Sequence, residues 1–68
     1  MKIIVNEEVI EIAEPAEVTV VLRLLDIEPE RRGIAVAVNE QVVRRAEWDT
    51  HVISAGDRIE IIQATQGG

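Results

Sequence analysis

The residues best suited to chemistry are the last four, Thr65, Gln66, Gly67 and Gly68. Glycine has no Cβ, so two glycines in succession make a thin, freely rotating segment. A terminal carboxylate is anionic at neutral pH, and at such a tip it can enter a narrow channel that excludes bulkier residues. It stays a poor acyl donor until something activates it. A frayed end or an expression remnant gives the same pattern, so the preceding sequence must decide.

No other residues assemble a catalytic or metal site. His51 is the only histidine, and without cysteine the chain can form no disulfide, thiolate zinc site or thiol nucleophile. Ser54 shows no recognisable Ser–His–acid spacing, which favours a turn role. We therefore expect a protein that is not an enzyme, with no catalytic residue, no metal and no cofactor of its own. The lack of cysteine also fits a reducing, cytoplasmic setting.

Composition limits the chain to one small domain. Its 68 residues are 47% hydrophobic, which is enough for one core. No stretch approaches the roughly 20 apolar residues of a membrane span, and residues 1–6 lack a signal-peptide cleavage region. We expect a cytoplasmic protein without a membrane partner. The net charge of −6 opposes nucleic-acid binding; it suits a basic protein partner, or solubility alone.

The chain before the tail predicts strands at both ends. Residues 2–6 and 9–13 are apolar, β-branched runs that predict an antiparallel hairpin. The run 34–38 is continuously apolar, which predicts a strand covered on much of both faces. Residues 42–43 begin a short return strand, residues 44–50 contain an irregular or single-turn segment, and residues 58–64 form the last strand.

One helix is predicted between these strands. Val18, Val21, Leu22 and Leu25 recur at i, i+3, i+4 and i+7, which predicts a helix over residues 18–27 that packs on a sheet. Thr19 is the predicted N-cap, accepting a backbone N–H bond in the first turn.

The order of these elements is ββαββ, an α+β protein with a mixed sheet packed on one helix. If the first and last strands are neighbours, they run parallel, which is the β-grasp architecture. We expect a β-grasp domain over residues 1–64 and a flexible tail over residues 65–68, with a reach of roughly 13 Å at about 3.3 Å per residue.

Six short stretches recur in one known family in this order and spacing. They are Leu22-x-x-Leu25, Ala35-Val-Ala-Val-Asn39, Val42-Val43, Arg45-Ala-Glu-Trp48, Gly56-Asp57-Arg58-Ile-Glu-Ile61 and Gly67-Gly68. Over its whole length the chain thereby resembles the sulfur-carrier family of thiamin biosynthesis (the ThiS family), ubiquitin-like β-grasp proteins that end in Gly-Gly. The departures, Arg44 in place of proline and Glu17 or Glu40 in place of glycine, affect turns rather than the tail.

The resemblance implies a carrier. A ubiquitin-activating-like adenylyltransferase would use ATP and Mg²⁺ to adenylate the carboxylate of Gly68, while Thr65, Gln66 and Gly67 thread into that partner. A persulfide from a cysteine desulfurase would convert the adenylate to a thiocarboxylate, and thiazole synthase would take the sulfur.

Alternatives remain open for the function and for docking. The tail could serve another acceptor, as the small subunit of molybdopterin synthase does, although those relatives tend to be longer and richer in aromatics. The chain could also be a β-grasp binding module or modifier whose tail is not sulfurated. Trp48 could anchor a partner or pack at the edge of the core, and Arg44 and Arg45 could form a docking patch or a solvated face.

Overall fold

The N-terminal runs form the predicted hairpin in the computed structural model, which describes residues 1–64. Strands β1 (Lys2–Val5) and β2 (Glu8–Glu11) pair antiparallel, with Ile3 opposite Ile10. Asn6 has φ +48° and Glu7 has φ +71°, and positive φ at both central residues is what a tight two-residue hairpin turn requires. The second strand starts one residue earlier and ends two residues sooner than predicted.

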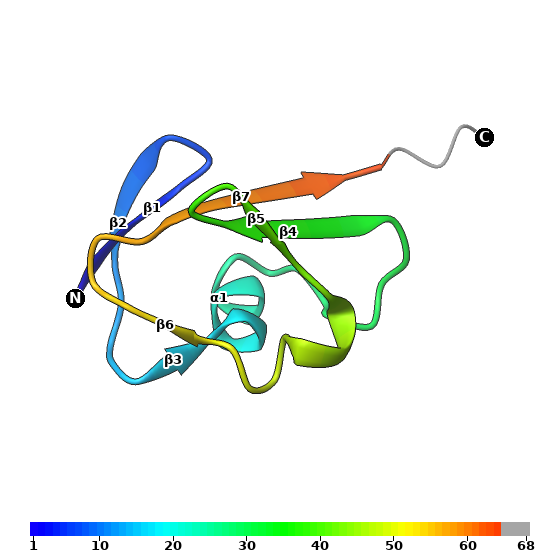
Figure 1. Cartoon of the computed structure of the whole chain (residues 1–68), viewed down its shortest axis with the longest axis horizontal. Helices are drawn as coiled ribbons and strands as arrows, with labels where there is room; N and C mark the ends of the chain where they lie inside the picture. Colours follow the sequence, from blue (N-terminus) through cyan, green and yellow to red (C-terminus); the bar gives the residue numbers. More distant parts are fainter. Residues whose placement is uncertain (65–68) are drawn as a thin grey trace.

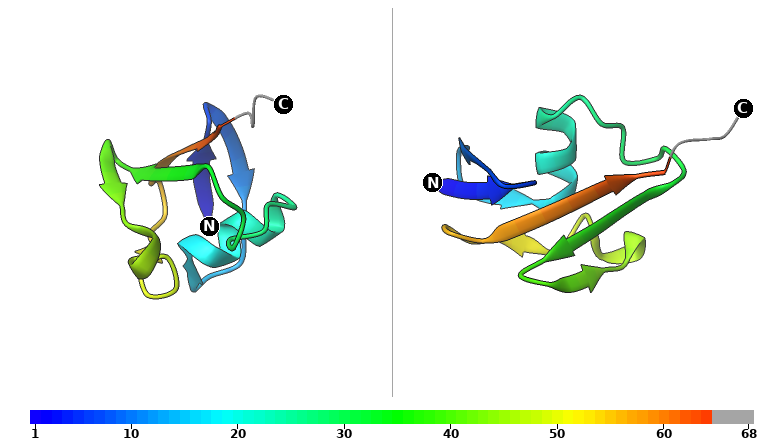
Figure 2. Two further views of the ribbon diagram at one scale, coloured as in Figure 1. Left: turned by 90° about the vertical axis from the view of Figure 1, so that its right-hand side faces the viewer. Right: turned by 90° about the horizontal axis from the view of Figure 1, so that it is seen from above.

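The last strand lies at the centre of the sheet. β7 (Arg58–Gln63) runs parallel to β1 and antiparallel to β4 (Ile34–Val38), and β5 (Gln41–Val43) pairs with β4 at the edge. The strand order is therefore β2-β1-β7-β4-β5, and Figures 1 and 2 show this curved sheet over one helix. The predicted ubiquitin-like β-grasp, with parallel first and last strands, is confirmed.

The helix α1 (Val18–Leu24) is three residues shorter than predicted. Asp26 adopts φ +60°. Its N–H donates to Arg23 O at 3.0 Å, and the N–H of Ile27 donates to Leu22 O at 2.9 Å. These two bonds around a left-handed residue are a Schellman ending, so the apolar side chain of Ile27 belongs to the cap.

The prediction of Thr19 as N-cap is wrong. Glu17 occupies that position and makes no side-chain cap bond. Thr19 lies inside the first turn, is only 6% exposed, and its hydroxyl donates to Asp49 Oδ1 at 2.5 Å. The Thr19 hydroxyl therefore bonds to Asp49, 30 residues away in the sequence, and not to a backbone N–H of its own helix as the local spacing predicted.

Two very short strands were not predicted. β3 (Ala16–Glu17) and β6 (Val52–Ile53) pair antiparallel beside the helix (Figure 1). Strands of two residues are too short to show a period-two pattern. The single turn expected within residues 44–50 is confirmed as a 3₁₀ helix, η1 (Arg45–Glu47).

The core lies between the sheet and the helix. Its members are aliphatic except for one tryptophan: Ile3, Val5, Ile12, Ala16, Val18, Val21, Leu22, Ile27, Ile34, Val36, Val38, Val43, Trp48, Ile53, Ile59 and Ile61. β4 contributes alternate residues, and Ala35 between them is exposed. The prediction that this strand is covered on both faces is therefore wrong, because helix α1 covers only one. Within residues 1–64, no helix is long and apolar enough to cross a membrane.

Candidate functional site

The central strand carries the chain to Ala64, the last residue that the structure describes. The N–H of Ala64 donates to Gly33 O at 2.7 Å, directly after the final β4–β7 register pair of Ile34 and Gln63. Gly33 has φ +78°, and a Cβ placed on it would stand 3.3 Å from the Cβ of Ala64. A glycine is needed here for its backbone angle as well as for the close approach. The strand is thus held to its final residue.

Asn6 holds the other side of this strand. Its side-chain oxygen accepts the N–H of Ile61 at 2.8 Å, and its amide nitrogen donates to Ile61 O at 3.2 Å. β1 ends at Val5, so the asparagine side chain supplies both bonds that a longer parallel neighbour would have made. β7 is therefore hydrogen-bonded on both sides close to its end.

The tail itself lies outside the described residues. Thr65, Gln66, Gly67 and Gly68 were the residues predicted to thread into a partner and to be modified, and that interpretation stays a prediction. The structure describes the chain up to Ala64, the residue before this tail. There the end of β7 lies beside the loop of residues 28–33 (Figure 2).

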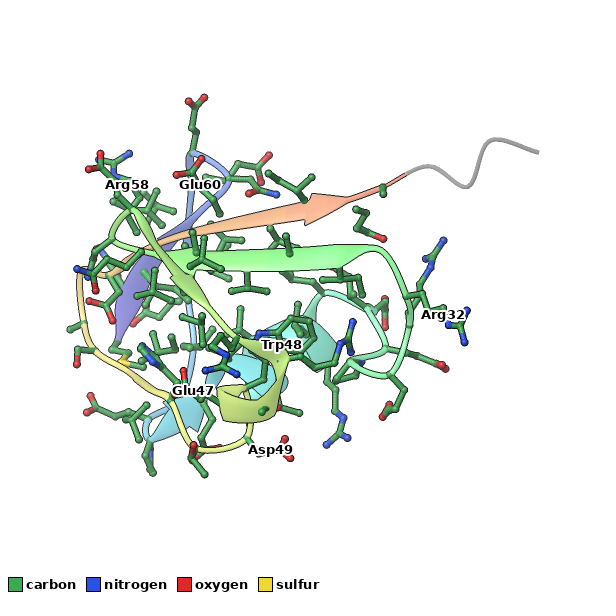
Figure 3. The ribbon with its side chains drawn as sticks, turned by 45° about the vertical axis from the view of Figure 1, so that its right-hand side comes forward. Arg32, Glu47, Trp48, Asp49, Arg58 and Glu60 are labelled. Carbon is green, nitrogen blue, oxygen red and sulfur yellow. The ribbon has the colours of Figure 1, made fainter. Side chains whose placement is uncertain are left out.

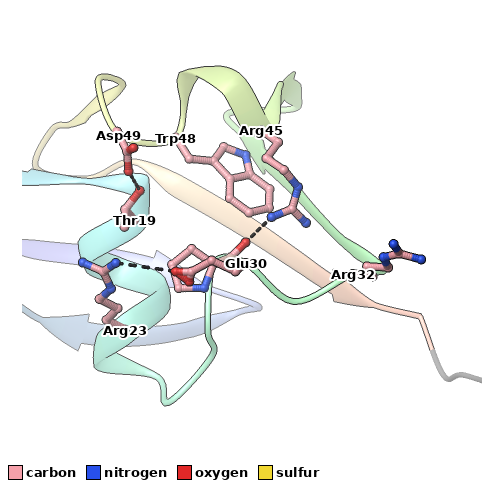
Figure 4. A pocket seen from close by; sticks show the side chains of 8 residues that line it. Thr19, Arg23, Glu30, Arg32, Arg45, Trp48 and Asp49 are labelled. Atoms are coloured by element: carbon pink, nitrogen blue, oxygen red, sulfur yellow. Dashed lines mark hydrogen bonds and ion pairs between the residues drawn. The ribbon is translucent and has the colours of Figure 1, made fainter.

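Arg45 organises that loop. Its guanidinium donates through Nη1 to Pro29 O and through Nη2 to Arg31 O, the second bond at 2.7 Å. The same group stacks over Trp48, 4.3 Å from the ring centroid (Figure 4). A planar guanidinium can make two directed bonds while stacking, which an ammonium group cannot. The backbone carbonyl of the neighbouring Arg44 accepts the N–H of Glu47 at 2.8 Å, whereas its side chain makes no hydrogen bond or ion pair with any residue in 1–64. Docking by either arginine stays a prediction.

Trp48 belongs to the core. It is 3% exposed, and its indole N–H donates to Val43 O at 2.9 Å. Of the two interpretations of this residue, packing is confirmed. Its use as a partner anchor stays a prediction, and only 3% of the residue is exposed for such a contact.

The uncovered face of the sheet carries an apolar patch that the sequence reasoning missed. In the register, Ala35 lies opposite Ile62, and Ala37 lies opposite both Val42 and Glu60. Ile62 is 64% exposed and Val42 is 77% exposed. We call Ala35, Ala37, Val42 and Ile62 the outer apolar face.

This outer apolar face is slightly hollowed and has an acidic border. The small alanine side chains leave a shallow depression between Val42 and Ile62, and Glu40 and Glu60 line it as well. Figure 3 shows Glu60 on the opposite side of the sheet from Trp48. The available signal was Ile62 itself, an apolar residue at an outward position of a strand whose other outward residues are Arg58 and Glu60.

The remaining candidates form no site. Ser54 lies in a turn, where its N–H donates to Asp57 Oδ2 at 2.8 Å and its carbonyl accepts the N–H of Asp57, so the turn interpretation is confirmed. His51 is half-buried, and its backbone carbonyl accepts the N–H of Val18 at 3.2 Å. Across residues 1–64, no three histidine, cysteine, aspartate or glutamate side chains gather where they could hold a metal ion.

Comparison with known proteins gives consistent matches over the full chain. The ThiS family model matches residues 2–68. The sulfur carrier protein ThiS of Escherichia coli (strain K12) is 34% identical over 68 residues, which is 100% of each chain. A crystal structure of the thiamine biosynthesis protein (ThiS) from Geobacter metallireducens has a TM-score of 0.82 at 27% identity, covering 100% of both chains. An NMR structure of a thiamine biosynthesis protein from the same organism gives 0.81 at 27% identity, covering 100% of this chain and 88% of that one.

Proposed function

The chain belongs to the ThiS family and is a sulfur carrier in thiamin biosynthesis, and from that premise we propose that the carboxyl group of Gly68 carries the sulfur. One observation supports the proposal most. The central strand of the sheet, bonded on both sides, ends at Gln63, only a few residues before a terminal Gly-Gly. A rigid body therefore presents a short segment with no bulky residue at its tip.

The proposed reaction proceeds in three displacements. A carboxylate oxygen of Gly68 attacks the α-phosphorus of ATP on a ubiquitin-activating-like adenylyltransferase, and pyrophosphate leaves with Mg²⁺. The terminal sulfur of a cysteine persulfide, supplied by a cysteine desulfurase, then attacks the carbonyl carbon, and AMP leaves. A thiol then attacks the cysteine sulfur of the resulting acyl disulfide; a new disulfide forms between the thiol and that cysteine, the S–S bond to the acyl sulfur breaks, and the thiocarboxylate leaves. Thiazole synthase then uses that sulfur.

The carrier contributes geometry to these steps, and the partner contributes the electrostatics. The tail carboxylate and the ATP phosphates are all anionic, so they approach only where partner cations and Mg²⁺ offset their repulsion. Thr65, Gln66 and Gly67 are the residues that we expect to line the partner's channel. No side chain of this chain takes part in bond making, so the protein is a co-substrate and not an enzyme. We place it in the cytoplasm, with no nucleic-acid or membrane partner.

The outer apolar face is the surface that we expect to dock. Ile62 lies on the same strand that leads to the tail, and exposed apolar groups grouped in this way mark interaction sites. Glu40 and Glu60 at its border favour a partner that surrounds an apolar contact with basic side chains. Arg44 remains an additional docking candidate.

Adenylate formation with a candidate adenylyltransferase tests the proposal. The parent chain should support ATP-dependent pyrophosphate release, and Gly67→Leu should abolish it while keeping the parent's Trp48 fluorescence and unfolding midpoint, because only the tip becomes bulky. Normal adenylation of Gly67→Leu would remove the steric argument. Co-purification with thiazole synthase rather than with the large subunit of molybdopterin synthase would identify the acceptor.

A further inference from the structure

We propose that Arg45 is a positioning residue for the carrier reaction: it fixes the loop of residues 28–33 and, through that loop, the point at which the tail leaves the domain. The inference rests on the proposed function of Gly68. Arg45 touches neither the tail carboxylate nor ATP, so its effect is transmitted through two contacts, from Arg45 to the loop and from the loop to Ala64.

The first contact ties the loop to the core. Arg45 donates to the carbonyls of Pro29 and Arg31 and stacks on Trp48, which is itself buried (Figure 4). In the described part of the chain, no other side chain donates to a carbonyl of residues 28–33. On the helix side of the loop, the other side-chain contact is the ion pair of Arg23 with Glu30 at 3.8 Å, and both groups are largely solvent-exposed. Exposed ion pairs of this kind contribute little free energy, so Arg45 is the main restraint on the loop from the helix side.

The second contact ties the loop to the end of β7. Gly33 accepts the N–H of Ala64 at 2.7 Å and lies against the Ala64 side chain. Arg31, whose carbonyl Arg45 holds, also reaches Gln63 Oε1 with its own guanidinium at 3.4 Å. The carbonyls that Arg45 fixes therefore lie two and four residues before the glycine that fixes Ala64.

Loss of this restraint changes binding rather than chemistry. If the loop is released, the Ala64 N–H loses its fixed acceptor and the last residues of β7 gain conformational freedom. A partner that receives the tail must then order them again, and the backbone entropy of one residue corresponds to a rise of about 5- to 30-fold in KM for the carrier. The kcat for adenylation stays the same, because the carboxylate of Gly68 is unchanged once it is bound.

The test combines amide hydrogen exchange with adenylation kinetics on the full chain. Arg45→Ala should speed exchange at Ala64 while leaving exchange at the core amide of Ile59 unchanged, and should raise KM about 5- to 30-fold with kcat retained. Arg45→Lys keeps the charge but lacks the planar fork, so it should resemble Arg45→Ala in both measurements. Arg32→Ala is the matched control, because it removes a guanidinium from the loop without removing the two bonds to Pro29 and Arg31.

Several results would overturn the positioning role. Slow exchange at Ala64 in Arg45→Ala would show that the loop does not depend on Arg45. Fast exchange at Ala64 with an unchanged KM in Arg45→Ala would show that the order of the strand end does not affect the partner. Fast exchange with an unchanged KM in Arg45→Lys would show that the charge of Arg45, and not its bonds to the loop, sets KM. A rise in KM in Arg32→Ala equal to that in Arg45→Ala would likewise assign the effect to positive charge on this surface. If the parent chain itself is not adenylated, the proposed function fails, and the positioning role fails with it whatever the exchange data show.

Discussion

The two faces of the sheet are built by the same strands and differ in what covers them. On β7, Ile59 and Ile61 point toward α1 and are buried, whereas Ile62 points away and is largely exposed. On β4, Ile34, Val36 and Val38 take the inner positions and Ala35 the outer one. Apolar residues therefore occur on both faces, but only the inner set belongs to the core.

If the outer apolar face docks as proposed, this difference separates the residues that stabilise the fold from those that recognise a partner. The contribution of a core residue is measured as a change in the free energy of unfolding. The contribution of a residue of the outer apolar face is measured as a change in affinity for the partner. Because Ile61 and Ile62 are consecutive in one strand, the same substitution at each gives a direct comparison of the two faces.

The largest effect on stability is expected at the inner residue of that pair. Ile61 is 7% exposed, so Ile61→Thr removes buried apolar volume and places a hydroxyl in an apolar environment. The expected loss is about 2–4 kcal/mol of the free energy of unfolding, measured by denaturant titration with Trp48 fluorescence. A loss as small as that of Ile62→Thr would show that the two faces are equally solvated, which would contradict the comparison.

An intermediate effect is expected where Asn6 holds the edge of β7. Asn6→Ala removes both bonds to Ile61 and places alanine at φ +48°, for an expected loss of about 1–3 kcal/mol. Asn39 is the matched control, because it also has a positive φ, at +51°, and also accepts a β7 N–H, that of Arg58. Its bonds are exposed, so Asn39→Ala should cost less. Equal losses would assign the whole effect to the turn angle.

A smaller effect is expected from the single buried polar side chain of the helix. Thr19→Val keeps the shape and removes the bond to Asp49, and we expect a loss of about 1 kcal/mol, since Asp49 can be hydrated in the variant. Asp49→Asn, which can still accept the bond, should retain more stability than Thr19→Val. An increase in stability for Thr19→Val would show that the hydroxyl bond contributes nothing to the fold.

The smallest effect on stability is expected on the outer apolar face. Ile62→Thr keeps a β-branched residue at an exposed position, so the free energy of unfolding should change by no more than about 0.5 kcal/mol. Affinity for the adenylyltransferase should fall by at least about fivefold, as expected for a contact worth 1 kcal/mol. Unchanged affinity in Ile62→Thr and in Val42→Thr would remove this face from the docking surface.

Much of the fold could be predicted from the sequence, because its longer elements have clear local patterns. The hairpin, the helix, the run of residues 34–38 and the final strand were all placed, and their order gave the sheet. The errors occurred where tertiary contacts decide. Thr19 bonds to a distant aspartate rather than capping the helix, and β3 and β6 exist only because they pair with each other.

The candidate site could be predicted only in part. The terminal Gly-Gly is visible as composition, whereas the anchoring of Ala64 by Gly33 depends on two segments 31 residues apart in the chain. Trp48 and Arg45 were recognised as notable residues, but sequence alone could not tell that the tryptophan is buried and that the arginine holds a loop. The outer apolar face was missed because a continuous apolar run does not show which side the helix covers.

The most direct test of the account is the intact mass of the full chain after incubation with the adenylyltransferase, ATP, Mg²⁺ and a persulfide donor, followed by fragmentation. We expect a mass gain equal to the replacement of one oxygen by sulfur, confined to the C-terminal fragment that contains Gly68 and lost in a chain that lacks Gly68. No gain, or a gain on any other fragment, would contradict the claim that this carboxyl group carries the sulfur.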